Sequence, residues 1–454
     1  MAMTRTRERN RAAGHDRPRP RGGFALLGGV QMTLIFTLAA LAVPLPRIGA
    51  EFRLDRADLI LLSAAYGLTF AGLLLLGGRL ADRLGGRRAL TAGLLVFGAA
   101  SALAPLAPGY EALLAARFGQ GVGAALVAPA AMAVLRALFP EPAAYGRAMA
   151  TWGGLSVLGA TAGNLLSGMI AAVASWRGTF AVPVAVALAA LLLAPRLLPA
   201  TPPGTNRALD LPGALLATAG ITLASYGLVL TDAHPWGSAP VLAPLLTGVA
   251  LLAAFAAVER RTADPLLPPD FLRDGRRVLG LAAIGLTAAG TATVFVLLSL
   301  ALQEQRGWSA PLTSAAFVPF AVALLGAGRL AGPLIGRYGP GRVTGAGLGT
   351  AAAGLALLAA TGFDASVPYA YGLLPGLLLL PVGGALSFAG AAVLATADVP
   401  AHRAGLAGGV LNTAMELGPT VLFAALLTLG GDAVSLAAAA VAFTALAATT
   451  IRTT

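Results

Sequence analysis

The sequence contains no cysteine and only three histidines, His15, His234 and His402, which lie far apart along its 454 residues. Without cysteine, the chain forms no disulfide bond and no thiolate metal site. Three scattered imidazoles do not supply the close ligand sets that zinc and other transition metals need. We therefore expect no metal site and no cofactor.

Charged side chains are also scarce. They make up 11% of the chain, whereas soluble domains carry about 25%. Hydrophobic residues make up 57%, and the few charges gather in short segments between apolar runs of membrane-span length. Length alone would suggest about three soluble domains, but the apolar runs predict an all-α membrane protein instead.

Lysine is absent, so all 31 basic residues are arginine, against 19 acidic residues. A net charge of +12 can indicate nucleic-acid binding. Here, however, the arginines cluster at the ends of apolar runs, which indicates a lipid bilayer and no nucleic-acid partner. The chain has no Gly-x-x-x-x-Gly-Lys phosphate loop, so an ATP-driven pump is not expected. No catalytic triad, paired histidines or clustered carboxylates indicate an enzyme.

Fourteen apolar runs are near or above the ~20 residues that a helix needs to cross ~30 Å of hydrocarbon. Their predicted limits are 24–46, 59–79, 89–107, 112–135, 148–172, 178–198, 210–231, 239–258, 278–302, 311–336, 343–361, 369–396, 405–429 and 433–451. An even number of spans places both termini on one side of the membrane. Roughly 25 arginines then lie on that side, which the positive-inside rule assigns to the cytoplasm.

The spans divide the chain into five segments. These are a cytoplasmic tail (1–22), an N-terminal six-helix bundle (23–200), two additional central helices (201–260), a cytoplasmic linker (261–277) and a C-terminal six-helix bundle (278–454). The tail is rich in arginine and cannot bury a core, so we expect it to be disordered.

The loop Gly78–Arg88 reads Gly-Arg-Leu-Ala-Asp-Arg-Leu-Gly-Gly-Arg-Arg and joins two apolar runs. A related segment, Gly332–Arg342, follows about 250 residues later. The alignment places Gly332 on Gly78, Gly336 on Asp82, Arg337 on Arg83, Gly339 on Gly85 and Arg342 on Arg88. Such a repeat indicates two related membrane halves. A plain topology anchor is the simpler alternative.

The loop Gly78–Arg88 resembles the signature between spans 2 and 3 of the major facilitator superfamily. Other segments resemble the same family: Arg117–Ala125 with Pro129, Trp176-Arg177 with Phe180, Leu302-Gln303 with Gly307–Ser309 and Pro319, and Ala404–Gly409 with Asn412-Thr413. With fourteen spans, the chain is similar to the drug–proton antiporter branch. The resemblance implies two pseudo-symmetric six-helix bundles, a central extra helix pair and alternating access driven by protons.

Three sites depart from that branch. Its first span commonly carries an Asp where this chain has Thr37. Its Gly-Pro-x-x-Gly-Gly signature in span 5 is replaced by Gly-Asn-Leu-Leu-Ser-Gly at 163–168. Its Arg-Gln in span 13 is replaced by Met415-Glu416. These changes leave the fold prediction intact and make the proton carrier and the transport direction open questions.

Two ionisable residues inside predicted spans are functional candidates by default. For Arg117 in span 4, the resemblance implies a role in proton transfer or in holding the halves together, and snorkelling to the outer interface is the alternative. Glu416 lies about eleven residues, or ~16 Å, into span 13. An ionised carboxylate is costly in hydrocarbon, so a carboxyl group there tends to bind a proton. We therefore predict that Glu416 carries the coupling proton. The alternatives are a carboxylate that attracts cationic substrate and a structural Glu bonded between helices.

The loop supplies the predicted cytoplasmic gate, which consists of Gly78, Asp82, Arg83, Gly85 and Arg88. A carboxylate can cap the N-terminus of a neighbouring helix and can pair with Arg. The resemblance implies that Asp82 locks the cytoplasmic side by contacting the second half near the start of span 11.

The substrate pocket is expected between the two halves near mid-membrane. The predicted lining residues are Thr37, Tyr66, Phe70, Trp152, Asn164, Phe295, Phe317, Phe388, Asn412 and Met415. For each residue taken alone, simple packing is the alternative, because aromatic side chains at helical spacing usually pack.

Taken together, the sequence predicts a proton-coupled exporter of amphipathic organic compounds such as antibiotics. We expect a monomeric multi-pass protein of the plasma membrane, whose partners are a small-molecule substrate and protons. An importer or uniporter on the same fold is the first alternative. A non-transporting membrane protein, either an embedded enzyme or a sensor, is the alternative of another class.

Overall fold

The computed structural model describes residues 20–41, 43–173, 175–201, 210–232, 234–361, 364, 366–427 and 431–453. These residues form helices and no strands. The long helices are α2 (Pro20–Ala39), α4 (Arg56–Leu84), α5 (Gly86–Leu103), α6 (Tyr110–Leu138), α7 (Pro142–Val173), α8 (Ala181–Leu197), α9 (Leu211–Val229), α10 (Ala239–Glu259), α11 (Gly275–Glu304), α13 (Val318–Tyr338), α14 (Pro340–Thr361), α16 (Leu374–Ala395), α17 (Ala404–Leu427) and α18 (Asp432–Thr453).

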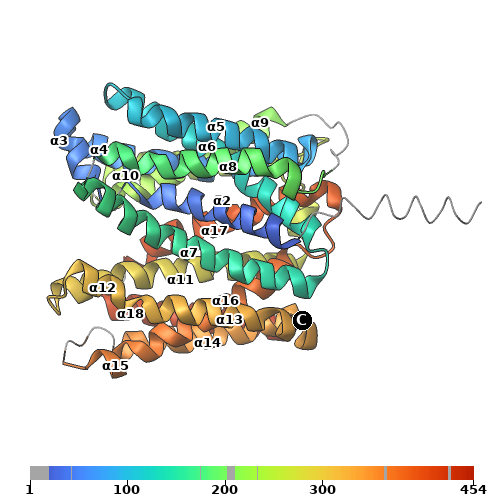
Figure 1. Cartoon of the computed structure of the whole chain (residues 1–454). Helices are drawn as coiled ribbons and strands as arrows, with labels where there is room; N and C mark the ends of the chain where they lie inside the picture. The colour runs from blue at the N-terminus through green and yellow to red at the C-terminus, as the bar shows by residue number, and fades with distance from the viewer. Residues whose placement is uncertain are drawn as a thin grey trace, which may run out of the picture.

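Thirteen helices among the described residues are long and apolar enough to span a membrane. They include every long helix except α17, so the predicted count of fourteen spans stays a prediction. The start of α2 and the end of α18 lie at the same end of the molecule (Figure 1). We call this end the arginine-rich end, because it also carries Arg83 and Arg88 of the predicted gate loop.

Three predicted spans end or break at short helices. The first was predicted to reach residue 46, but α2 ends at Ala39 and a separate helix, α3, covers Leu45–Phe52. The run 311–336 is divided into α12 (Ala310–Ala316) and α13, which has a proline at its start. The run 369–396 is divided into α15 (Tyr369–Gly372) and α16, which also has a proline in its first turn. Proline lacks the N–H that would continue each preceding helix.

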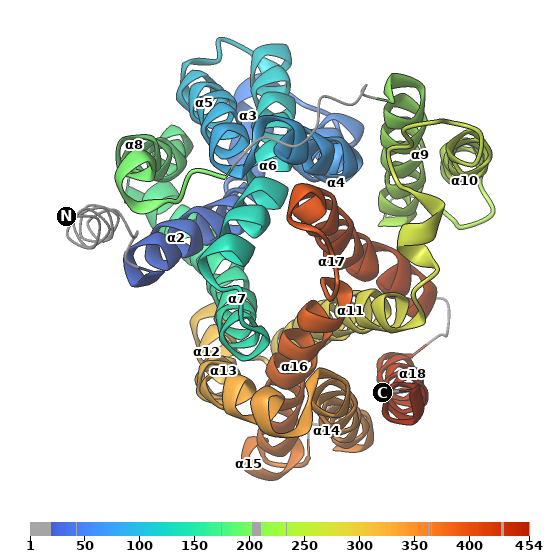
Figure 2. The same cartoon turned by 90° about the vertical axis from the view of Figure 1, so that its right-hand side faces the viewer.

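The helices form two groups that pack against each other (Figure 2). The first group contains α2 and α4 to α8, and the second contains α11, α13, α14 and α16 to α18. Across the boundary, α4 and α6 pack against α17, and α7 packs against α13 and α16. The pair α9 and α10 is central in the sequence but lies at the side of the molecule, where α9 contacts α4 and α17.

The repeated loop turns at a glycine with the same φ angle in both copies. Gly85 separates α4 from α5, and Gly339 separates α13 from α14, each with φ of 83°. Residues with a Cβ rarely adopt this left-handed conformation. The alignment of the two loops in the sequence therefore corresponds to two equivalent turns.

Helix α3 is attached to the rest of the first group by Glu51. Its carboxylate accepts hydrogen bonds from Trp176 Nε1 (2.7 Å) and Arg177 Nη1 (3.1 Å). Trp176 and Arg177 belong to the 3₁₀ helix η2 (Trp176–Phe180). The Arg177 hydrogen bond, followed by the Trp176 hydrogen bond, holds the pKa of Glu51 below its usual value.

We expect Glu51→Gln to lower the stability of the folded protein slightly, by less than about 1 kcal/mol, because the pair is exposed to solvent. A lowered folded-state pKa means that the stabilisation is present at neutral pH and is lost as the pH falls through that pKa. Thermal unfolding should therefore separate the variant from the parent at about pH 7 and not at about pH 3. An equal difference at both pH values would contradict the electrostatic account.

Candidate functional site

A cavity of about 430 Å³ lies between the two groups of helices. Its wall comes from α2, α7, α11, α13, α16 and α17, so both groups contribute. Most lining side chains are apolar. The polar ones are Ser156, Thr161, Thr287, Thr291 and Glu416. The cavity can therefore hold an apolar molecule with a few hydrogen-bonding groups.

Among the described residues that line this wall, Glu416 alone carries a carboxylate. It lies twelve residues after the start of α17, or ~18 Å along the helix. Its side chain is half-buried beside Met415 and Pro419. Within the described part of the chain, no hydrogen bond or ion pair reaches its carboxylate. The interhelical hydrogen bond that was one alternative for Glu416 is therefore not found there.

Three of the ten predicted substrate residues line the cavity: Phe295, Phe388 and Met415. Phe317 lies behind this wall, where its ring stacks on Phe295 with centroids 4.4 Å apart. The side chain of Asn164 lies outside the described residues. Sequence reasoning missed Phe320, which lines the cavity and meets Phe295 edge-on at 5.1 Å.

The other five predicted substrate residues do not line the cavity. They are Thr37, Tyr66, Phe70, Trp152 and Asn412, each with at most 3% of its surface exposed. Thr37 donates to the carbonyl of Thr33, and Asn412 donates to that of Gly408, each one turn back on its own helix. In the described structure, these polar and aromatic residues are satisfied by local hydrogen bonds or by packing instead.

Arg117 is buried inside the first group, with 1% of its surface exposed. Its Nη1 donates to the carbonyl of Thr37 and to Gln120 Oε1, both at 3.1 Å. Its guanidinium also lies 5.0 Å from the centre of the Tyr66 ring. Gln120 in turn donates to Ser101 at 2.9 Å. Arg117 therefore joins α2, α4 and α6, and the snorkelling alternative is wrong.

Asp82 crosses from the first group to the second at the arginine-rich end. Its Oδ1 accepts the backbone N–H of Gly405 (2.6 Å), and its Oδ2 accepts that of Leu406 (2.9 Å). These are free N–H groups of the first turn of α17, where a negative charge is also favoured by the helix dipole. The prediction placed this contact at span 11, which was wrong. The carboxylate reaches α17, which covers most of the predicted span 405–429.

The helices α4 and α17 cross closely at Gly78 and Gly405. A Cβ on Gly78 would lie 2.6 Å from the carbonyl oxygen of Gly405, closer than real Cβ contacts. The crossing therefore requires glycine on α4, and it brings Asp82, one turn later, within reach of the start of α17.

We expect Gly78→Ala to push α4 and α17 apart and to lower the melting temperature of the protein. The matched control is Gly29→Ala in α2, where a Cβ would meet nothing within 4 Å. The control should be neutral or slightly stabilising, because alanine favours helix by about 1 kcal/mol over glycine. Equal melting temperatures for the two variants would contradict the tight crossing.

The predicted gate arginines Arg83 and Arg88 are exposed. Their neighbours make the contacts instead: Arg79 donates to the carbonyls of Pro265 and Leu266, and Arg87 donates to that of Leu198. Sequence reasoning missed Arg79 and Arg87. The helical period was the available signal for Arg79, because it lies three residues before Asp82 and shares its face.

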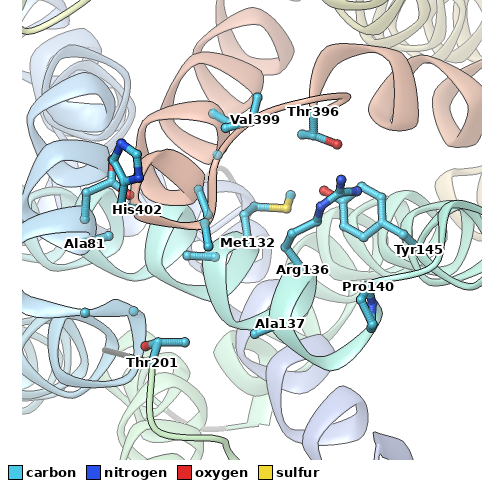
Figure 3. A pocket seen from close by; sticks show the side chains of 18 residues that line it. Ala81, Met132, Arg136, Ala137, Pro140, Tyr145, Thr201, Thr396, Val399 and His402 are labelled. Atoms are coloured by element: carbon cyan, nitrogen blue, oxygen red, sulfur yellow. The ribbon is translucent and has the colours of Figure 1, made fainter. Parts of the chain in front are cut away.

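A second pocket, of about 610 Å³, lies at the arginine-rich end and shares no lining residue with the central cavity. Figure 3 shows Arg136 beside the Tyr145 ring on one side, with Ala81 and His402 on the other. The Arg136 guanidinium lies 5.0 Å from the centre of that ring. Asp82 also lines this pocket.

The second copy of the loop faces α7 as the first faces α17. The side chain of Arg147 on α7 lies against Gly332, and a Cβ on Gly336 would lie 3.7 Å from Ala143 at the start of α7. Gly336 occupies the place of Asp82, so this crossing has no equivalent carboxylate. No cluster of metal-ligating side chains is found among the described residues.

Residues 25–423 match the family model described as Major Facilitator Superfamily. The chain is 37% identical over 418 residues to the cephamycin export protein CmcT of Amycolatopsis lactamdurans, covering 88% of this chain and 83% of that protein. It is also 37% identical over 404 residues to the puromycin resistance protein pur8 of Streptomyces alboniger, covering 88% and 80%. The lincomycin resistance protein of Streptomyces lincolnensis is 34% identical over 400 residues, covering 87% and 81%.

Solved structures share the fold at low identity. The proton:xylose symporter XylE has a TM-score of 0.67 at 16% identity and covers 95% of both chains. The human organic anion transporter MFSD10 has a TM-score of 0.65 at 18% identity, covering 96% of this chain and 100% of that one.

Proposed function

This chain belongs to the major facilitator superfamily, and we propose that it is a proton-coupled exporter of amphipathic organic compounds, including antibiotics. The observation that carries the proposal is the cavity of about 430 Å³ between the two groups of helices. Its largely apolar wall contains the Glu416 carboxylate, for which the described residues supply no hydrogen-bond or ion-pair partner. Relatives named for cephamycin export and for puromycin and lincomycin resistance support this class of cargo.

The proposed architecture is that of the fourteen-helix drug–proton antiporter branch. In it, α17 is also a span and brings the count to fourteen. Residues 23–200 and 278–454 are pseudo-symmetric bundles, 201–260 adds two helices, and 261–277 is a cytoplasmic linker. Both termini, including the tail 1–22, lie in the cytoplasm. The equivalent turns at Gly85 and Gly339 support the pseudo-symmetry. We place the protein in the plasma membrane as a monomer.

The proposed transport cycle is alternating access. In the described state, the contact between Asp82 and the start of α17 closes the arginine-rich end. Releasing that contact lets the two groups rock and opens the cavity to the cytoplasm. Gly78, Gly85 and the exposed Arg83 and Arg88 complete the gate.

The proposed proton carrier is Glu416. Because it faces the cavity without a partner in the described residues, it can exchange a proton there and can alternate between a proton and a cationic group of the cargo. Arg117 acts from the neighbouring network, where it holds α2 against α4 and α6. As a permanent cation it does not itself release the proton.

The direction of transport tests the proposal against an importer on the same fold. Inverted membrane vesicles with an acid interior should accumulate a fluorescent amphipathic antibiotic, and a protonophore should abolish the accumulation. Uptake that only equilibrates the compound, whether or not a proton gradient is present, would favour a uniporter. Loss of preloaded compound on acidifying the interior would favour an importer.

A further inference from the structure

Two buried carboxyl groups meet at the arginine-rich end of the helix pair α9 and α10. The two helices pack against each other, so the start of one lies beside the end of the other. Asp210 immediately precedes α9 and is 9% exposed, and Glu259 ends α10 and is 4% exposed. Neither residue belongs to the central cavity or to the second pocket.

The two carboxyl groups have different partners. Asp210 Oδ1 accepts the backbone N–H of Gly213 at 2.9 Å and caps α9. The two oxygens of Glu259 accept the backbone N–H groups of Leu266 (3.1 Å) and Leu267 (2.8 Å). Asp210 Oδ2 is fully buried, and no donor for it is found in the part of the chain that the structure describes.

That unpartnered oxygen points at Glu259. A Cβ on Gly213 would contact both Asp210 Oδ2 and Glu259 Oε1, and the two side chains are within hydrogen-bonding reach of each other. Two ionised carboxylates at this separation repel each other, and burial makes the repulsion worse. One proton held between them removes the repulsion and supplies the missing donor.

We propose that Asp210 and Glu259 form a proton-binding site, in which one proton is shared between the two carboxyl groups and keeps the segment 260–268 folded against α4. With the proton on Asp210, its O–H donates to Glu259, which stays ionised and accepts the two N–H groups of the segment. Loss of the proton to water leaves two adjacent negative charges and loosens the segment. This inference does not rest on the proposed export function.

The same segment is held from its other side by α4. Arg79 Nε donates to the carbonyl of Leu266 at 2.7 Å, and a second Arg79 nitrogen donates to that of Pro265. Arg79 lies three residues before Asp82. The elements that pack against the helix pair carry several charged groups: Arg79, Asp82 and Arg83 at this end of α4, Arg260, Arg261 and Asp264 in the segment, and Glu416 twelve residues along α17. The proton site therefore adjoins the closed α4–α17 contact.

Hydrogen–deuterium exchange of the full-length protein in lipid nanodiscs tests the proposal directly, through the peptide that contains the Leu266 and Leu267 amides. After correction for intrinsic exchange, protection should fall about tenfold between about pH 6 and about pH 9. In Asp210→Asn the side-chain amide donates to Glu259 permanently, so protection should not depend on pH. Asp432→Asn, which changes a partly buried carboxylate at the start of α18, should retain the pH dependence of the parent.

Glu259→Gln provides a second variant if Asp210→Asn does not fold. The glutamine amide group can donate a hydrogen bond to Asp210. It has only one oxygen, however, where the two Glu259 oxygens accept the N–H groups of Leu266 and Leu267. We therefore expect pH-independent protection with one of the two amides exchanging about tenfold faster.

Three results would overturn the proposal. The first is flat protection in the parent protein. The second is the same pH dependence in Asp210→Asn as in the parent. The third is recovery of protection at high pH when sodium replaces choline as the cation of the buffer. That result would show that the carboxyl pair binds a cation instead of a proton.

Discussion

Glu416→Gln should reduce proton-driven efflux by about 100-fold, the contribution typical of one positioned proton-transfer group. Glutamine has nearly the same size and can keep the same contacts with Met415 and Pro419, but it binds and releases no proton. The cavity should therefore remain and still bind cargo, while its coupling to the proton gradient is lost. Efflux of a fluorescent cargo from energised cells or proteoliposomes measures the rate.

The matched control for this prediction is Glu304→Gln. Glu304 ends α11 and is exposed, so it carries the same chemical change outside the cavity. Its efflux rate should equal that of the parent protein. Proton-driven efflux at the parent rate by Glu416→Gln would show that another group carries the proton.

Asp82→Asn should reduce transport by about tenfold or more while leaving membrane insertion unchanged. Its carboxylate accepts two N–H groups of α17, whereas an asparagine amide accepts through one oxygen and places a donor against the other N–H. Losing a charge-assisted contact of this kind costs about 1.5–3 kcal/mol, which is at least a tenfold change in the population of the closed state. Transport assays paired with topology reporter fusions separate the two effects.

Asp432→Asn is the control for the gate. Asp432 also lies in the first turn of a helix, but it is only partly buried and belongs to α18. It should transport at the parent rate. Normal transport by Asp82→Asn would contradict the role of this contact in the cycle.

The helical fold and the repeated loop could be predicted from the sequence, each for a physical reason. Hydrocarbon requires every backbone group to be satisfied within a helix, so apolar runs marked the positions of the long helices. The glycine at 85 and its counterpart at 339 could be aligned because only glycine suits their backbone. The breaks before α13 and α16 were missed, although Pro319 and Pro375 mark them.

The site could be predicted only in part, because composition does not show which face of a helix meets the cavity. Phe295 and Tyr66 look alike in sequence, yet one lines the cavity and the other is buried beside Arg117. Similarly, Arg79 and Arg83 both lie in the repeated loop, and the sequence alone predicted Arg83 as the gate residue. The fold places Arg79 towards residues 265 and 266 and leaves Arg83 exposed. Contacts between segments distant in sequence decided each case.

In the proposed transport cycle, the two groups of helices rock about the shared cavity. The chain has no cysteine, so spin labels can be attached to cysteines introduced at Arg88 and Arg342 alone, which are exposed and equivalent in the two loops. Double electron–electron resonance should then give two distance populations across the arginine-rich end. Acid pH, cargo and Asp82→Asn should change their ratio. A single distance, unchanged under all these conditions, would contradict the account.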